Sequence, residues 1–266
     1  MQDWLAAILL GIVEGITEFL PISSTGHLRL AEHWLGLPET SFLRSELFNV
    51  GIQSGAVLAV IAVFSDRVKQ FATRFAEPAT REYLLKLGAA FVLTAVGGLA
   101  MKKAGLKLPK EVAPIAWATL IGGVLFLAVE RWLKNKPAAA DITWSIAIAI
   151  GVGQLVAAAF PGASRSGTTI LAALALGLNR PAATEFSFLL GVPTLLAAGA
   201  YSALKAMKDP AAPPPDWGLL AIGALVSAVT AFLAVKWLLR FIQTHTFIAF
   251  GWYRVAMGGI TLLVGK

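Results

Sequence analysis

Long apolar runs joined by short polar segments make up most of this chain. Six of the runs can each cross a membrane, because a helix of about 20 apolar residues spans the roughly 30 Å hydrocarbon core of a bilayer. They cover residues 47–64, 83–101, 114–132, 186–204, 217–239 and 247–264. Only 14% of the residues are charged, whereas soluble domains average about 25%. The sequence therefore predicts an all-α polytopic membrane protein with a single integral membrane domain over residues 1–266, and it excludes a soluble role.

The basic residues indicate membrane topology rather than nucleic-acid binding. The formal net charge is +7, but the lysines and arginines lie in short clusters between apolar runs, as in the loops of membrane proteins. We therefore expect membrane lipids, and no nucleic acid, as partners. The chain has no cysteine, which excludes disulfides and thiolate chemistry. The first apolar run contains Glu14 and Glu18 and is not preceded by a basic residue, which argues against a cleaved signal peptide.

Two further apolar runs, residues 4–20 and 142–160, each end at a proline that small polar residues follow. The two breaks read Pro21-Ile-Ser-Ser-Thr-Gly-His27 and Pro161-Gly-Ala-Ser-Arg-Ser-Gly-Thr-Thr169. Polar backbone at membrane depth is tolerated only where protein buries it or where it lines a wet cavity. The sequence therefore predicts two re-entrant helical hairpins in addition to the six transmembrane helices.

The two broken segments match each other at an offset of 140 residues, which indicates an internal repeat. The matching pairs are Gly11 and Gly151, Glu14 and Gln154, Pro21 and Pro161, and Ser24 and Ser164. Repeat 1 covers about residues 1–135 and repeat 2 about residues 141–266. One hairpin and three crossings in each half would turn the second copy upside down. These inverted-topology repeats predict a site near mid-membrane, where the broken helices meet.

Glu14 and Glu18 lie four residues apart, so a helix presents both carboxylates on one face. Ionisable groups inside a membrane are expensive and usually mark function. Paired carboxylate oxygens suit a hard divalent cation, Mg²⁺ or Ca²⁺, that bridges to a phosphate. Alternatively, one carboxyl is protonated or both line a wet vestibule without a role.

Each break offers hydroxyl groups at the expected start of a new helix, where free N–H groups and the helix dipole attract anions. The first break supplies Ser23, Ser24 and Thr25 before His27, and the second supplies Ser164, Ser166, Thr168 and Thr169 around Arg165. Two such helix starts and the guanidinium of Arg165 predict a phosphate clamp. Simple helix capping explains the hydroxyl residues but leaves His27 and Arg165 unexplained.

The spacing of Ser24 and His27 lets both side chains reach one face of a helical turn, as a nucleophile and a proton carrier would. Arg254, in the last apolar run, is a weaker candidate for a substrate contact. Snorkelling or an internal ion pair explains Arg254 equally well. The phosphate loop of nucleoside triphosphatases is missing from the sequence. No histidine follows Arg165 in the second hairpin, unlike in the acid-phosphatase-like lipid phosphatases.

Residues 14–27 and 161–169, together with Glu185-Phe-Ser-Phe-Leu-Leu190, resemble the bacterial undecaprenyl-pyrophosphate phosphatases of the bacitracin-resistance type. The resemblance implies a multi-pass enzyme of the bacterial cytoplasmic membrane. Such an enzyme removes the terminal phosphate of a fifty-five-carbon polyprenyl pyrophosphate, which recycles the lipid carrier for peptidoglycan synthesis and confers bacitracin resistance. The resemblance also implies that the enzyme needs a divalent cation and that its active site faces the periplasm.

The resemblance assigns roles position by position. Glu14 and Glu18 become the acidic pair, Ser24 the nucleophile and His27 the acid or base. Arg165 grips the phosphate together with Ser164, Ser166 and Thr169, and we add Ser23 and Thr25 as substrate-binding hydroxyls. Attack through phosphoserine, through phosphohistidine or by water directly stays open at this point, as does a homodimer.

A secondary transporter or polyprenyl-phosphate flippase is the competing function, because inverted repeats with broken helices are typical of transporters. The two halves differ, however, at the positions that carry charge. Glu14 and Glu18 match Gln154 and Ala158, while Arg165 lies in the second half only. This asymmetry favours an enzyme.

Overall fold

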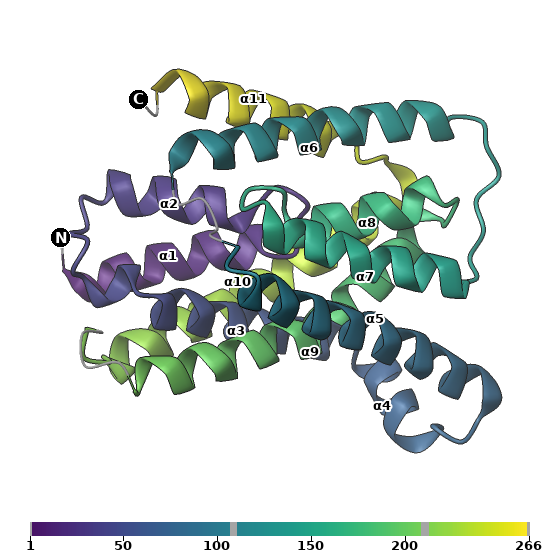
Figure 1. Cartoon of the computed structure of the whole chain (residues 1–266), viewed down its shortest axis with the longest axis horizontal. Coiled ribbons are helices and arrows are strands. Elements are labelled where there is room, and N and C mark those ends of the chain that lie inside the picture. The colour runs from purple at the N-terminus through teal and green to yellow at the C-terminus, as the bar shows by residue number, and fades with distance from the viewer. Residues whose placement is uncertain (1, 107–110, 209–212, 265–266) are drawn as a thin grey trace.

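The computed structural model describes residues 2–106, 111–208 and 213–264, and within them the chain is helical apart from its connections (Figure 1). The helices are α1 Asp3–Thr17, α2 Ser24–Trp34, the 3₁₀ turn η1 Phe42–Arg44, α3 Glu46–Val63, α4 Ser65–Thr73, α5 Pro78–Lys103, α6 Val112–Leu133, α7 Trp144–Ala159, α8 Arg165–Ala175, α9 Arg180–Ala206, α10 Trp217–Thr244 and α11 Ile248–Val264.

Each of the six predicted crossings corresponds to one helix. In the described residues, α3, α5, α6, α9 and α10 are long and apolar enough to cross a membrane by length and composition. Helix α11 is also apolar but has only 17 residues. Large apolar side chains point outward from the bundle, among them Val92, Val96, Leu225 and Leu233, which are 56–68% exposed. A soluble protein rarely exposes so much apolar surface, so the class of all-α polytopic membrane protein is confirmed.

The two predicted breaks are present and form helical hairpins. Helices α1 and α2 occupy one end of the bundle, α7 and α8 occupy the other, and their tips meet in the middle (Figure 1). Ser23 and Ser164, which occupy the N-cap positions of α2 and α8, have left-handed φ angles of 76° and 70°. The counterpart of Ser164 is therefore Ser23 and not Ser24, because the second break is one residue longer than the constant offset predicts.

Helices of the two halves pack in matching pairs. Helix α1 lies against α10 and α7 lies against α5, while α3 pairs with α9 and α6 with α11. The approach is closest at glycines: a Cβ on Gly11 would lie 2.6 Å from the carbonyl oxygen of Gly223, and one on Gly151 would lie 3.1 Å from that of Ala90. This pattern agrees with inverted repeats, while the repeat boundaries near residues 135 and 141 stay a prediction.

An aromatic contact next to the first break packs this break against α9. Phe19 lies two residues after the end of α1, and its ring packs edge-on against that of Phe188 in α9, with 5.0 Å between the centroids. Both side chains are fully buried. Because the residues next to Phe19 belong to the first break, this contact holds the break against α9.

Candidate active site

Three of the predicted site residues meet where the hairpin tips touch. Ser24 donates a hydrogen bond from Oγ to Glu18 Oε2 at 2.7 Å, and Arg165 Nη2 donates to Glu18 Oε1 at 3.0 Å. Glu18 directly follows α1, Ser24 begins α2 and Arg165 begins α8, so the two predicted repeats contribute together. The side chains of Glu18 and Arg165 are only 6% and 12% exposed. A carboxylate, a hydroxyl and a guanidinium thus share a secluded, polar interior.

Most of the hydroxyl groups in the second break bind backbone atoms. Ser166 donates to the carbonyl oxygen of Leu20 at 3.0 Å, which joins the second hairpin to the first break. Ser164 accepts from the Gly167 N–H at 3.1 Å as the cap of α8, and Thr169 donates to the carbonyl of Arg165 at 2.8 Å. These contacts shape the helix start, whereas Thr25 is exposed and lies apart from the Glu18 cluster.

Glu14 lies one turn before Glu18 and is completely buried. Among the described residues, neither of its carboxylate oxygens has a hydrogen-bond partner. An unpaired carboxylate in such a place is costly unless it binds a proton or a cation. The described residues contain no group of three or more histidines, cysteines or carboxylates that could hold a metal. One or two carboxylates suit Mg²⁺, which completes its coordination with water and phosphate oxygens.

Arg165 is held from several sides and still keeps a free donor. Its Nη1 donates to the carbonyl of Ser187 at 3.4 Å, and its guanidinium lies 5.0 Å from the ring centroid of Phe19. Gly191 leaves the space that Nη1 occupies, which a Cβ would fill. Among the described residues, Nε of Arg165 is buried without a partner. A guanidinium fixed in this way can offer its remaining N–H to a phosphate oxygen.

His27 does not pair with Ser24, as the three-residue spacing had suggested. Its Nδ1 lies 2.8 Å from the carbonyl oxygen of Ser23, and its Nε2 lies 2.6 Å from the hydroxyl of Tyr253 in α11. The hydrogen-bond partner of Ser24 is Glu18 instead. Sequence reasoning missed Tyr253, because 226 residues separate it from His27 and no spacing rule joins two such positions.

Arg254 donates hydrogen bonds to both breaks. The side chain is fully buried and donates to the carbonyl oxygens of Pro21 at 3.2 Å, Ala163 at 2.8 Å and Thr119 at 3.1 Å. It therefore neither snorkels nor forms an ion pair within the described residues. The carbonyls of Pro21 and Ala163 are groups that the broken helices leave free, whereas Thr119 lies within α6. The sequence signal that could have identified this structural role of Arg254 is a charged residue in the middle of an apolar run.

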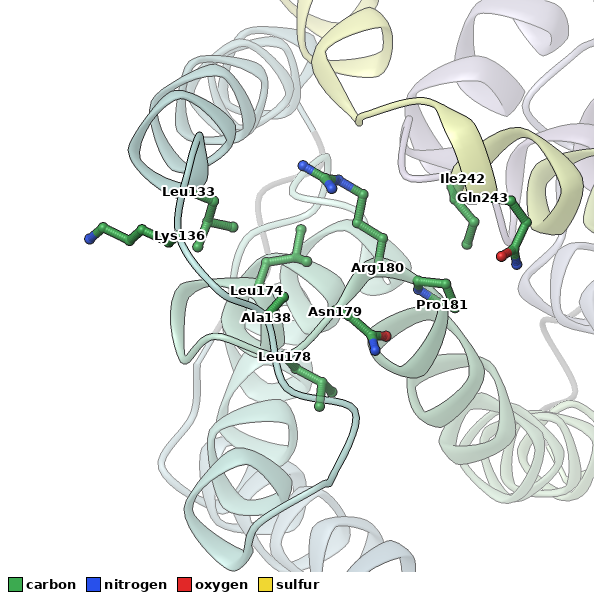
Figure 2. Close-up of a pocket in the computed structure, with 10 residues that line it drawn as sticks. All are labelled: Leu133, Lys136, Ala138, Leu174, Leu178, Asn179, Arg180, Pro181, Ile242 and Gln243. Atoms are coloured by element: carbon green, nitrogen blue, oxygen red, sulfur yellow. The ribbon is translucent and has the colours of Figure 1, made fainter.

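Two cavities lie outside this cluster. One, of about 190 Å³, is formed by the ends of α6, α8 and α10 and the start of α9 (Figure 2), and is lined by Leu133, Lys136, Ala138, Leu174, Leu178, Asn179, Arg180, Pro181, Ile242 and Gln243. Figure 2 shows Lys136 pointing away from the other lining residues, and Arg180 is ion-paired with Glu130. This cavity therefore offers no free cation to an anion. The other, of about 290 Å³, has mostly apolar walls between α6, α7 and α8, and Thr168 of the second hairpin and Arg254 of α11 also line it.

The fold and the site together define a class: a polytopic helical membrane protein with a buried cluster of a carboxylate, a hydroxyl and a guanidinium between two broken helices. The contacts among Glu18, Ser24 and Arg165 carry that definition. Within this class, the chain belongs to the family described as bacitracin resistance protein BacA, whose model matches residues 7–260. The match covers both hairpins and confirms the resemblance of the two motifs.

Similar curated proteins extend over nearly the whole chain. An undecaprenyl-diphosphatase of Rhizobium etli is 48% identical over 262 residues, which cover 98% of this chain and 97% of that protein. A protein of the same name from Xylella fastidiosa is 46% identical over 98% of both chains. A third, from Xanthomonas axonopodis pv. citri, is 46% identical over 99% of this chain and 97% of its own.

Proposed function

We propose that this chain is an integral membrane phosphatase that hydrolyses undecaprenyl pyrophosphate to undecaprenyl phosphate and phosphate. The near-full-length similarity to proteins named for that activity supports this function. So does the family match, which also indicates the bacterial inner membrane. The product is the lipid carrier that peptidoglycan synthesis reuses. The description of the family as bacitracin resistance protein supports a role in that resistance.

The contact between Ser24 and Glu18 is the observation that carries the mechanism. The Ser24 oxygen attacks the terminal phosphorus while its proton passes to Glu18 Oε2, 2.7 Å away. The bond from that phosphorus to the bridging oxygen breaks, and the electron pair leaves with undecaprenyl phosphate. Water then releases phosphate from Ser24. Glu18 thus takes the role of base for the attack, as carboxylates do when held in hydrogen-bond reach.

Arg165 neutralises charge on the transferring phosphoryl group. It is the one arginine whose guanidinium binds Glu18 in the described residues, so it lies beside the attacking oxygen. A preorganised guanidinium stabilises developing charge on phosphoryl oxygens more than it stabilises the ground state. His27, on the far side of Ser23, is the candidate that supplies a proton to the leaving phosphate.

Glu14 and Glu18 would hold a divalent cation, Mg²⁺ or Ca²⁺. The free oxygens of Glu14 support this assignment, and each Glu18 oxygen keeps a second lone pair beyond the one that its present partner uses. When bound, the cation supplies positive charge to the pyrophosphate oxygens. Without it, Arg165 alone faces the negative charge of the pyrophosphate.

The site accounts for a substrate that is both charged and very apolar. The head group must reach the hairpin tips in the interior, while the prenyl tail stays among the outward apolar side chains. We assign the α1–α2 end to the periplasm, as the family resemblance implies, and a small excess of exposed or loop-proximal bases at the opposite end agrees, since such bases favour the cytoplasm. These bases are Arg67, Lys69, Arg74, Arg81, Lys134 and Lys136.

Phosphate release by the full chain, purified in detergent, tests the proposal. With undecaprenyl pyrophosphate as substrate, we expect release with Mg²⁺ or Ca²⁺ and its loss with a chelator. Ser24→Ala should abolish release, and Ser23→Ala should be milder because Ser23 does not bind Glu18. Full activity of Ser24→Ala would reject Ser24 as nucleophile and favour His27 or water. Absence of any release by the wild-type chain would overturn the proposed function.

Lipid transport is the second candidate function, and the matched packing of the two halves favours it, since transporters of inverted repeats share such packing. In a flippase, both halves would have to bind the head group in turn. Gln154 in the place of Glu14 argues against equal binding by the two halves. Translocation of a labelled polyprenyl phosphate across liposomes that contain the protein distinguishes the two functions.

A further inference from the structure

Tyr253, which pairs with His27, has no part in the mechanism so far. The two rings are nearly parallel, with 5° between their planes and 5.7 Å between their centroids. The Tyr253 hydroxyl lies 2.6 Å from His27 Nε2. Helix α2 packs mainly on α1 and α6, so this bond ties the first hairpin to the last helix of the chain.

The partners of the ring decide which of its nitrogens can exchange a proton. The carbonyl oxygen of Ser23 can only accept, so Nδ1 must carry a hydrogen at its distance of 2.8 Å. Nε2 is then the nitrogen that gains or loses a proton. In the described residues its hydrogen-bond partner is the Tyr253 hydroxyl, and the charge of Arg254, from the same helix as Tyr253, acts on the ring.

A tyrosine hydroxyl is suited to a histidine that changes its protonation state. It donates to Nε2 when the imidazole is neutral, and it accepts from Nε2–H when the imidazole is charged. A carboxylate or an ammonium would hold only one of the two states. Tyr253 is 44% exposed, so its ring lies at the rim and not in the sealed interior beside Glu18.

We propose that Tyr253 relays the proton of His27 to the leaving phosphate: the Tyr253 hydroxyl gives its proton to the leaving oxygen while Nε2–H of the charged imidazole gives its proton to the Tyr253 oxygen, 2.6 Å away. This inference rests on the proposed role of His27 as the proton donor to the leaving phosphate. Without the hydroxyl, the ring stacking would remain but Nε2 would lose its partner. The charged imidazole would then have no hydroxyl through which to pass its proton to the leaving phosphate, and the effect should fall on kcat more than on KM.

Tyr253→Phe removes the hydroxyl and keeps the ring. We expect kcat for phosphate release to fall about tenfold, a part of the roughly 10²- to 10⁴-fold that general acid–base catalysis supplies, with little change in KM. Tyr201→Phe is the matched control: it makes the same chemical change in α9, where Tyr201 contacts Lys102. That variant should keep the activity of the wild type.

Nitrogen NMR of the full chain labelled with ¹⁵N-histidine gives a readout apart from activity. The chain has three histidines, and His27→Gln identifies the signals of His27. We expect Nδ1 to be protonated, and we expect Tyr253→Phe to shift the Nε2 signal while Tyr201→Phe does not. An unchanged Nε2 signal, or a shifted signal with unchanged kcat, would overturn the inference. Full activity of His27→Gln would instead reject the role proposed for His27, and the Nε2 signal would still report the bond to Tyr253.

Discussion

At the residue scale, Glu18 connects more of the site than its spacing from Glu14 suggested. The sequence predicted the acidic pair, the hydroxyl of Ser24 and the cation of Arg165, because polar groups in apolar runs stand out. It could not predict that Glu18 binds Ser24 and Arg165 at once. That contact depends on how the two breaks face each other, and spacing along one helix does not encode this geometry.

The acidic pair should show two different defects when each glutamate is changed to glutamine. Glu14→Gln should lower turnover at least about tenfold, which corresponds to about 1.4 kcal/mol of transition-state stabilisation, and should raise the Mg²⁺ concentration needed. Glu18→Gln should lose more, because it also removes the base next to Ser24. Turnover measured against Mg²⁺ concentration separates the two effects. Near-normal, chelator-sensitive turnover in the double variant would reject the assignment of the pair.

Arg165→Lys separates charge from geometry. An ammonium keeps the charge but cannot reach Glu18 and the Ser187 carbonyl together with a phosphate, as the guanidinium fork can. We expect kcat to fall at least about tenfold while KM changes little, because the lost contacts act mainly in the transition state. Steady-state kinetics in detergent checks this. A raised KM with an unchanged kcat would show that Arg165 only docks the substrate.

At the element scale, the sequence predicted the long helices and both breaks, since apolar runs and proline followed by small polar residues leave clear patterns. It missed α4, because nine residues that include Asp66, Arg67 and Lys69 form no apolar run. It also misaligned the breaks by one residue. The left-handed backbone at Ser23 and Ser164 is a conformation that serine rarely adopts, so the residue types gave no sign of it.

The hydrogen bonds from Arg254 to both breaks lead to a prediction about stability. Arg254→Met leaves at least one buried carbonyl group at the breaks unpaired, which costs about 1–3 kcal/mol for each group. We expect lower thermal stability in detergent and lower activity together. Arg240→Met is the control, because Arg240 is an exposed arginine in α10. Lost activity with unchanged thermal stability would mean that Arg254 contacts substrate instead of supporting the breaks.

At the scale of the whole molecule, the two halves pack in matching pairs of helices, but the charged residues that meet at the hairpin tips differ between the halves. The packing pairs follow from apolar faces and glycines that the sequence shows, such as Gly11 and Gly151. The charges do not follow the symmetry, because the carboxylates come from the first half and Arg165 from the second. Hydrolysis at one fixed site can use charged residues that differ between the two symmetrically packed halves. A transporter that works by alternating access would use both halves alike.

The proposed orientation of the whole molecule can be tested directly, because the chain has no cysteine of its own. Glu39 lies exposed between α2 and α3, and Ala76 lies exposed between α4 and α5, at the opposite end of the bundle (Figure 1). A membrane-impermeant maleimide added to spheroplasts should label Glu39→Cys at once, and Ala76→Cys only after the membrane is opened. Both variants should keep their phosphatase activity, since neither residue contacts the site. The reverse labelling pattern would place the α1–α2 hairpin toward the cytoplasm, and the substrate would then have to reach Ser24 from that side.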